Sequence, residues 1–234
     1  MRISVIIPAF NEEKSIPYVL NDIPNFVNQI IVCDNSSTDK TSEIAKSFGA
    51  KVVFEKKKGY GYACLKAISY LKNLKIKPEI VVFIDGDYSD DPKEMIKIID
   101  PIVNEGYDFV LGARTESLRD KHSMTTHQIF GNWLACLLMK IFFDSAFKDL
   151  GPFRAITWDK LMQLNMRDKT FGWTIEMQIK ALMKNYKYKE IAVKYKKRIG
   201  KSKISGTLRG SFLAGKKILY LIFKYYLKKK FGVL

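Results

Sequence analysis

Short apolar runs alternate with stretches of helical length over the first 112 residues of this 234-residue chain. The runs are rich in β-branched residues and have the length of strands: residues 3–7, 30–33, 51–54, 80–84 and 109–111. Because they are apolar throughout, they are typical of strands that are covered on both faces. The intervening helical stretches are residues 15–22, 41–48, 61–74 and 92–105. The pattern therefore predicts an α/β domain with a mainly parallel sheet flanked by helices.

The pattern changes after Gly112, where residues 114–128 are polar and rich in turn formers. Residues 129–143 then form a strongly apolar stretch of helical length. Fifteen residues that include an asparagine and a lysine are too few and too polar to span a bilayer. We therefore expect a buried core helix there rather than a helix that dips into a membrane. Residues 187–197 alternate apolar and basic positions, as a half-exposed strand does.

The tail of the chain is helical again and has a basic face. At about 100° per residue, Lys216, Lys217, Lys224 and Lys228 project to one side of this helix. This pattern is typical of a helix that lies on an anionic bilayer, and a terminal helix packed on the domain with a solvated lysine face is the alternative. We divide the chain into a domain of residues 1–210 and an amphipathic C-terminal helix of residues 211–234.

The composition limits the classes of binding partner and the cellular compartment that we expect. The chain has 40 Lys and Arg against 24 Asp and Glu, a formal net charge of +16, so anionic partners are expected. Its three cysteines are odd in number and far apart, which is typical of reduced thiols in a cytoplasmic protein. The N-terminal apolar run is too short for a signal peptide. We expect a protein on the cytosolic side, peripheral on the membrane.

Two aspartates, Asp85 and Asp87, follow the fourth predicted strand with Gly86 between them. In open α/β sheets ligands bind beyond the carboxyl ends of strands, and carboxylates there suit Mg²⁺ or Mn²⁺ bridging a diphosphate. By itself the spacing favours an ordinary turn that ends the strand. The first and second strands also end in polar segments, residues 11–13 and 34–39. Together the three ends predict a crevice in which a carboxylate binds base or ribose while a metal holds phosphate.

These motifs resemble those of the family 2 glycosyltransferases, and within that family those of the dolichyl-phosphate mannose and glucose synthases. The matching segments run in the family's order over roughly residues 3 to 205: IIPAFNEE, VCDNSSTDKT, KGYGYA, FIDGDYSDDP, LGAR, GN at 131–132 and LGPFRAI. The resemblance implies a GT-A fold, which is Rossmann-like. It also implies inverting transfer from a nucleotide-diphosphate sugar, and frequent association with membranes.

The resemblance also implies roles for single residues at the donor end. The nucleotide sugar would be bound by Pro8, Phe10, Glu12, Val32, Asp34 and Gly86. Asp85 and Asp87 would ligate the metal, Mg²⁺ or Mn²⁺, with Ser89 close by. The family's Arg-x-x-Gly-x-Ser-Lys phosphate-binding stretch corresponds to residues 197–203, with its arginine displaced by one position. We therefore prefer Lys203 to Arg198 as a ligand of the departing diphosphate.

The acceptor end is less well defined by the sequence. Arg114 and Arg154 could bind an acceptor phosphate by charge-assisted hydrogen bonds, although Arg154 could equally form an internal ion pair with Asp149. A phosphate monoester is already ionised near neutral pH, whereas a hydroxyl acceptor needs a general base. Glu176 is the candidate base, and the alternative is a carboxylate placed to favour a helix dipole.

The function that we expect is transfer of a sugar from a UDP- or GDP-sugar to a polyprenyl (dolichyl-type) phosphate at the cytosolic membrane face. The alternative keeps the donor and uses a hydroxyl acceptor on a lipid, a glycan or a small metabolite. A sugar nucleotidyltransferase would carry a Gly-rich, Arg-containing loop after the first strand, where this chain has residues 8–12, PAFNE. A nucleic-acid binder is not expected, because acidic strand ends repel phosphate. Base, sugar, metal and oligomeric state stay open.

Overall fold

The computed structural model describes residues 1–200 and 208–232. One sheet crosses the molecule in the order β3-β2-β1-β4-β6-β5-β7. Its strands are β1 (Ile3–Ala9), β2 (Gln29–Asp34), β3 (Lys51–Phe54), β4 (Ile80–Phe83), β5 (Phe109–Ala113), β6 (Arg154–Thr157) and β7 (Tyr188–Ala192). All neighbouring pairs are parallel except those of β6, which is antiparallel to β4 and β5. The expected mainly parallel sheet is confirmed.

The pattern of the sequence did not predict strand β6. It is four residues long and begins with a charged residue, Arg154, so it lacks the apolar run by which the other strands are recognised. It joins the sheet because its backbone pairs with a strand on each side. Arg154 lies opposite Phe83 of β4, and Ile156 lies opposite Phe109 of β5. Tertiary pairing therefore decides this strand.

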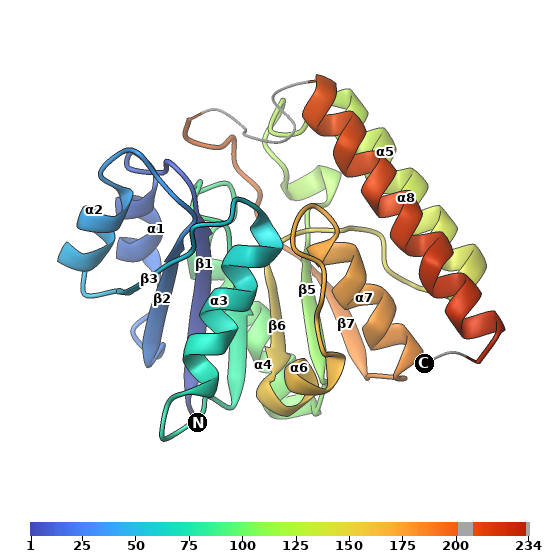
Figure 1. Ribbon diagram of the computed structural model, residues 1–234, viewed down its shortest axis with the longest axis horizontal. Coiled ribbons are helices and arrows are strands. Elements are labelled where there is room, and N and C mark those ends of the chain that lie inside the picture. The colour runs from blue at the N-terminus through green and yellow to red at the C-terminus, as the bar shows by residue number, and fades with distance from the viewer. Residues whose placement is uncertain (201–207, 233–234) are drawn as a thin grey trace.

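Helices cover both faces of the sheet (Figure 1). They are α1 (Ile16–Asp22), α2 (Thr41–Ser47), α3 (Tyr60–Lys72), α4 (Met95–Glu105), α5 (Thr126–Phe143), α6 (Trp158–Leu164), α7 (Trp173–Met183) and α8 (Leu208–Lys230), with 3₁₀ turns at η1 (Pro92–Glu94) and η2 (Glu116–Leu118). Along β1, Ile6 belongs to the core that includes residues of α3, α5, α6, α7 and α8, whereas Val5 and Ile7 belong to the core that includes residues of α1, α2 and α4. This two-sided burial explains the continuous apolar strands.

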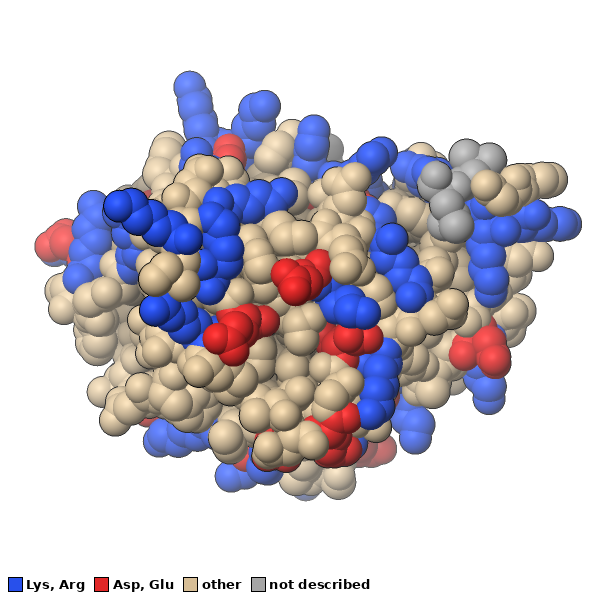
Figure 2. All heavy atoms as spheres, turned by 90° about the horizontal axis from the view of Figure 1, so that it is seen from below, with Lys and Arg blue, Asp and Glu red and all other residues tan. Residues whose placement is uncertain are grey.

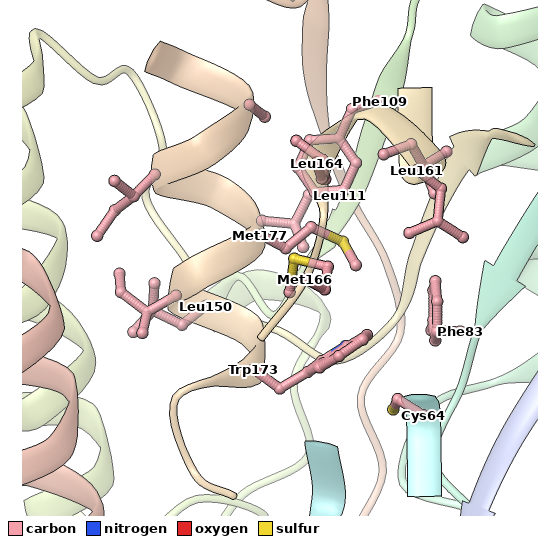
Figure 3. Packing of buried hydrophobic residues seen from close by; sticks show 14 of the residues in the cluster. Cys64, Phe83, Phe109, Leu111, Leu150, Leu161, Leu164, Met166, Trp173 and Met177 are labelled. Atoms are coloured by element: carbon pink, nitrogen blue, oxygen red, sulfur yellow. The ribbon is translucent and has the colours of Figure 1, made fainter. Parts of the chain in front are cut away.

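The larger of the two cores centres on α7 and the sheet (Figure 3). The ring of Trp173, at the start of α7, lies with its centroid 6.0 Å from that of Phe83 on β4. Cys64 of α3 lies below Phe83 in the view of Figure 3, and all three cysteines are buried and free. The core therefore joins α7 to the strands that carry the polar ends.

Helices α5 and α8 lie side by side at one end of the molecule (Figure 1). Helix α5 buries Ala135, Cys136, Met139 and Phe143, but its opposite side exposes Phe130 (60%), Trp133 (54%) and Ile141 (63%). The expectation of a buried core helix is corrected, because only one face of α5 is covered. None of the helices in residues 1–200 and 208–232 has the length and apolar character needed to cross a membrane.

Helix α8 is part of the domain rather than a separate appendage. It begins at Leu208, three residues before the boundary that we expected, and it buries Leu221, Ile222 and Tyr225 in the larger core. The boundary at residue 210 thus marks a change in the sequence pattern. Side chains from both sides of this boundary pack in the same core.

Candidate active site

The polar ends of three strands meet at one edge of the sheet, as their sequence pattern predicts. Strands β2, β1 and β4 are neighbours and run parallel, so their carboxyl ends lie together at the top of Figure 1. A pocket of about 590 Å³ lies over this edge and extends to α5 and α8. This edge is where open α/β sheets bind ligands.

The donor end of the pocket contains most of the expected nucleotide-sugar residues. Its walls include Pro8, Phe10, Glu12, Asn35, Lys58, Gly59, Tyr60, Asp85, Gly86, Asp87 and Arg198. Val32 and Asp34 are not among the lining residues. The carboxylate of Asp34 accepts hydrogen bonds from the Ser37 N–H (2.8 Å) and the Ser42 hydroxyl (2.5 Å), so it orders the loop that follows β2.

The two carboxylates of the aspartate pair differ in their partners: both oxygens of Asp87 have partners, whereas Oδ1 of Asp85 has none. In Asp87, Oδ1 accepts hydrogen bonds from the backbone N–H (2.9 Å) and the hydroxyl (2.5 Å) of Ser89, and Oδ2 lies 2.6 Å from Arg198 Nη2. The Oδ1 atom of Asp85 is buried and has no hydrogen-bond partner. Burial and the neighbouring Asp87 carboxylate raise the pKa of Asp85 to about 7 because both oppose its negative charge.

A divalent cation fits this pair of carboxylates. An orphaned carboxylate oxygen at a strand end is a hard ligand of the kind that Mg²⁺ and Mn²⁺ prefer. In the described ranges no group of three or more His, Cys, Asp and Glu side chains is arranged to hold a metal. Asp85 and Asp87 would hold the ion, and Ser89 would keep Asp87 in place through its two hydrogen bonds to Oδ1.

Arg198 reaches the acidic pair although its position in the motif is displaced. Its Nη2 atom pairs with Asp87 and lies 3.8 Å from Glu12 Oε1. A backbone hydrogen bond from the Ile199 N–H to the Asp87 carbonyl (3.0 Å) holds this segment beside β4. Lys203, which we preferred as the diphosphate ligand, lies outside the described residues. The arrangement makes Arg198 a candidate cation of the donor end.

Towards α5 and α8 the walls become mostly apolar. They include Leu134, Ala135, Leu150, Trp173, Ala214, Ile218 and Leu219, together with His127 and Arg114. The guanidinium of Arg114 is fixed by Asp149 through its Nε (2.8 Å) and Nη2 (2.7 Å) atoms. Its other amino group, Nη1, supplies two further N–H donors. Arg114 is thus held rigidly at the junction of the polar and apolar halves.

The structure places Arg154 beneath the pocket rather than in its wall. The side chain is fully buried, and its guanidinium donates to the carbonyl oxygens of Thr174 (3.0 Å), Leu150 (3.4 Å) and Gly151. Burial lowers the pKa of Arg154 to about 10. Arg154 therefore supports the β6 end of the sheet, and this placement does not favour contact with an acceptor phosphate.

Glu176 is also enclosed, with 1% of its surface exposed. Its carboxylate accepts hydrogen bonds from the backbone N–H groups of Arg167 and Asp168 and from the Tyr225 hydroxyl, and it pairs with Lys180. It is not a lining residue of the pocket. This placement does not favour the role of general base that the sequence suggested for it.

Residues that the sequence reasoning left without a role also form the donor end. Asn35 holds the segment after β3 through hydrogen bonds from the Gly59 N–H to its Oδ1 (2.7 Å) and from its Nδ2 to the Lys57 carbonyl (2.7 Å). Lys58 Nζ lies 4.8 Å from the centre of the Phe10 ring. The KGYGYA motif was the signal for these residues, but only the fold shows that Lys58 faces Phe10.

Comparisons with known proteins agree with this geometry. The family model described as "Glycosyl transferase family 2" matches residues 4–191. An uncharacterized glycosyltransferase of Mycobacterium tuberculosis is 32% identical over 213 residues, which cover 91% of this chain and 94% of that relative. The dolichyl-phosphate hexose transferase of Haloferax volcanii is 28% identical over 221 residues, covering 93% and 92%.

The fold is also that of a solved glycosyltransferase. Glucosyl-3-phosphoglycerate synthase from Mycobacterium tuberculosis, crystallised with Mn²⁺, UDP and phosphoglyceric acid, superposes with a TM-score of 0.76 over 96% of this chain and 78% of that one, at 20% identity. Another crystal of the same enzyme contains Mg²⁺ and UDP. The expected GT-A architecture is confirmed.

Proposed function

This chain belongs to glycosyl transferase family 2 and is a glycosyltransferase, and from that premise we propose that its acceptor is a polyprenyl (dolichyl-type) phosphate. A phosphate oxygen of the acceptor would displace the nucleoside diphosphate from the anomeric carbon of a UDP- or GDP-sugar, with inversion. The observation that carries the proposal is one continuous pocket, whose walls include Asp85, Asp87 and Arg114 and, at its other end, apolar residues of α5 and α8.

The donor end would neutralise the departing nucleoside diphosphate. Asp85 and Asp87 would hold Mg²⁺ or Mn²⁺, which would supply Lewis-acid stabilisation of the phosphate charge. The glucosyl-3-phosphoglycerate synthase of similar fold was crystallised with either ion and UDP. Arg198 and Lys58 lie at the same end and would add charge-assisted hydrogen bonds to the diphosphate. Glu12, with Phe10 beside Lys58, would contact the nucleoside.

At the acceptor end, Arg114 would bind the phosphate. Because Asp149 fixes two nitrogens of Arg114, which lines the pocket, binding through the third nitrogen would cost little side-chain freedom. A phosphate acceptor needs no general base, which agrees with the enclosure of Glu176 away from the pocket. The Haloferax relative named dolichyl-phosphate hexose transferase supports an acceptor of this class.

The outer faces of α5 and α8 would rest on the cytosolic face of an anionic membrane. Exposed apolar side chains occur on both helices, among them Phe130 and Trp133 on α5 and Phe212 (72%) and Phe223 (45%) on α8. Lysines flank them at the C-terminal end of α8. Aromatic side chains beside lysines are typical of interfacial helices.

A transfer assay tests the proposal. The protein is incubated with radiolabelled UDP- and GDP-sugars, Mg²⁺ or Mn²⁺ and a short-chain polyprenyl phosphate, and label is counted in the organic phase. We expect label from one donor, and its loss when a chelator removes the metal. If no label enters the organic phase while label is transferred to an alcohol, the proposal that the acceptor is a polyprenyl phosphate would be wrong.

The hydroxyl acceptor is the second candidate because a possible base lines the pocket. His127 lies in its wall, with Nε2 3.0 Å from the Thr125 hydroxyl, and the enzyme of similar fold was crystallised with phosphoglyceric acid. His127→Gln should abolish transfer to a hydroxyl and leave transfer to a phosphate nearly intact. The two acceptors are thereby distinguished with one variant.

A further inference from the structure

The segment between α6 and α7, residues 165–172, is held by two buried carboxylates. Glu176 accepts hydrogen bonds from the Arg167 N–H (3.0 Å) and the Asp168 N–H (2.6 Å). Asp168, which is 6% exposed, accepts hydrogen bonds at Oδ1 from the N–H groups of Thr170 (2.8 Å) and Gly172 (2.9 Å). Both carboxylates therefore fix the backbone of this segment, which we call the 165–172 loop.

Helix α8 contacts both of these carboxylates. Lys217 Nζ lies 2.9 Å from Asp168 Oδ2, and the Tyr225 hydroxyl donates a hydrogen bond to Glu176 Oε1 (2.8 Å). Between them, Leu221 covers Gly172 so closely that a Cβ on this glycine would lie 2.1 Å from Leu221 Cδ1. Two polar contacts and one tight apolar contact thus join α8 to the loop.

The other side of the 165–172 loop contacts the donor end of the pocket. The Tyr62 N–H donates to the Lys169 carbonyl (3.0 Å). A Cβ on Gly61 would lie 2.2 Å from the Asp168 carbonyl oxygen, and one on Gly59 would lie 2.4 Å from that of Lys169. Gly59 itself lines the donor end. A shift of the loop would therefore move the start of α3 and the wall around Asp85.

We propose that Asp168 and Glu176 are positioning residues that couple α8 to the donor end of the pocket, so that docking of α8 on an anionic lipid surface strengthens nucleotide binding. The inference rests on the proposed function for the nucleotide and the lipid surface. A bilayer that binds the seated form of α8 favours the ordered loop, and by linkage the nucleotide that needs this loop binds more tightly. The coupling runs through Lys217 and Tyr225 on α8.

The dissociation constant for UDP and for GDP, each with Mn²⁺, tests the coupling in the presence and absence of vesicles of phosphatidylcholine and phosphatidylglycerol. For the wild-type protein we expect vesicles to lower the dissociation constant of the preferred nucleotide about fivefold or more, in the usual range of coupling between sites. Vesicles of phosphatidylcholine alone should leave it unchanged.

Two matched pairs of variants test whether the coupling depends on Lys217 and Tyr225. Tyr225→Phe and Lys217→Met should lose the vesicle effect, whereas Tyr220→Phe and Lys216→Met, on the exposed side of the same helix, should keep it. Lys217→Met and Lys216→Met remove the same charge, so a difference between them cannot come from weaker attraction to the vesicle. Thermal unfolding of each variant identifies any that lose the fold, and Tyr225→Phe, which keeps the ring, serves as the conservative test.

The outcomes separate this inference from the proposed function. No vesicle effect on the wild-type protein, or equal effects within each pair, would overturn the coupling while nucleotide binding stands. Failure of the wild-type protein to bind either nucleotide would overturn the proposed function together with the coupling.

Discussion

At the scale of single residues, the aspartate pair shows how a common spacing becomes a site. Asp87 is oriented by Ser89 on one oxygen and by Arg198 on the other, whereas Asp85 presents a buried oxygen without a partner. Asp90 lies behind them, fully buried, and burial with the charges of Asp85 and Asp87 raises its pKa well above the usual range. Burial therefore favours a neutral Asp90, and the carboxylates that line the pocket are those of Glu12, Asp85 and Asp87.

Replacing Asp87 by Asn should abolish metal-dependent transfer, with a loss of about 100-fold or more, as for other groups that stabilise charge in a transition state. The amide can still accept the hydrogen bonds from Ser89, so the fold should survive. Transfer assays with circular dichroism check both statements. Asp100→Asn on the exposed side of α4 is the control, and a similar loss there would refute the assignment.

Glu190 on β7 gives a pH dependence of stability. Burial raises the pKa of its carboxyl from 4.5 to about 7, despite hydrogen bonds from the N–H groups of Lys148 and Asp149. Between these values the folded protein binds more protons than the unfolded chain, so stability falls as the pH rises from about 4.5 to 7. Urea unfolding of the wild type and of Glu190→Gln checks this: the decline should be smaller in the variant, where the raised pKa of Asp85 still contributes. Identical pH profiles would contradict the prediction.

At the scale of elements, α3 and the 165–172 loop approach each other so closely at two glycines, Gly59 and Gly61, that no side chain would fit there. Gly61 lies within the first turn of α3, and its missing Cβ would collide with the Asp168 carbonyl. Gly131 in α5 has open space at the same position. Gly61 therefore permits close packing. Gly131 makes no such close approach, and as a flexible residue within a helix it lowers the stability.

Gly61→Ala should reduce the free energy of unfolding by about 1–3 kcal/mol, the usual range for overpacking. Gly131→Ala should raise it by about 0.5–1 kcal/mol, because alanine favours the helix. Chemical denaturation of both variants measures the difference. Equal effects would show that the loop can move away from α3, which would also weaken the coupling that we infer.

At the scale of the whole molecule, positive charge is spread widely. Figure 2, which views the end away from the pocket, shows Lys and Arg over that surface, with Asp and Glu between them. The net charge of +16 therefore attracts anionic surfaces over a long range but does not orient the molecule by itself. Orientation would come from the exposed apolar faces of α5 and α8, which occur at one end only.

Vesicle sedimentation tests this orientation. The sequence alone suggests removal of the tail, but a chain that ends near residue 210 would also lose the core residues Leu221 and Ile222. Replacing Phe130 and Trp133 together by Ser should instead lower binding to anionic vesicles about a hundredfold or more, since burial of each aromatic side chain contributes roughly 1.5–3 kcal/mol. Phe48→Ser, exposed at the end of α2, should bind as the wild type does, and salt should weaken all three.

The sequence by itself determined the order of the elements over the first 112 residues and the type of sheet. Continuous apolar runs require cover on both faces, and polar residues at the ends of neighbouring parallel strands meet at one edge. The candidate donor residues Glu12, Asp85 and Asp87 lie at these strand ends, and their individual roles were implied by the family resemblance. Their position next to the strands means that few contacts from distant segments are needed to place them.

Only the tertiary structure decided the rest. Strand β6 owes its place to pairing with β4 and β5, and its sequence has no strand pattern of its own. The sequence presents Arg154 and Glu176 as charged residues beside family motifs, but packing encloses both and uses their charge to hold backbone groups. Burial depends on segments far apart in the chain, here α7 and α8, and no local pattern contains that information.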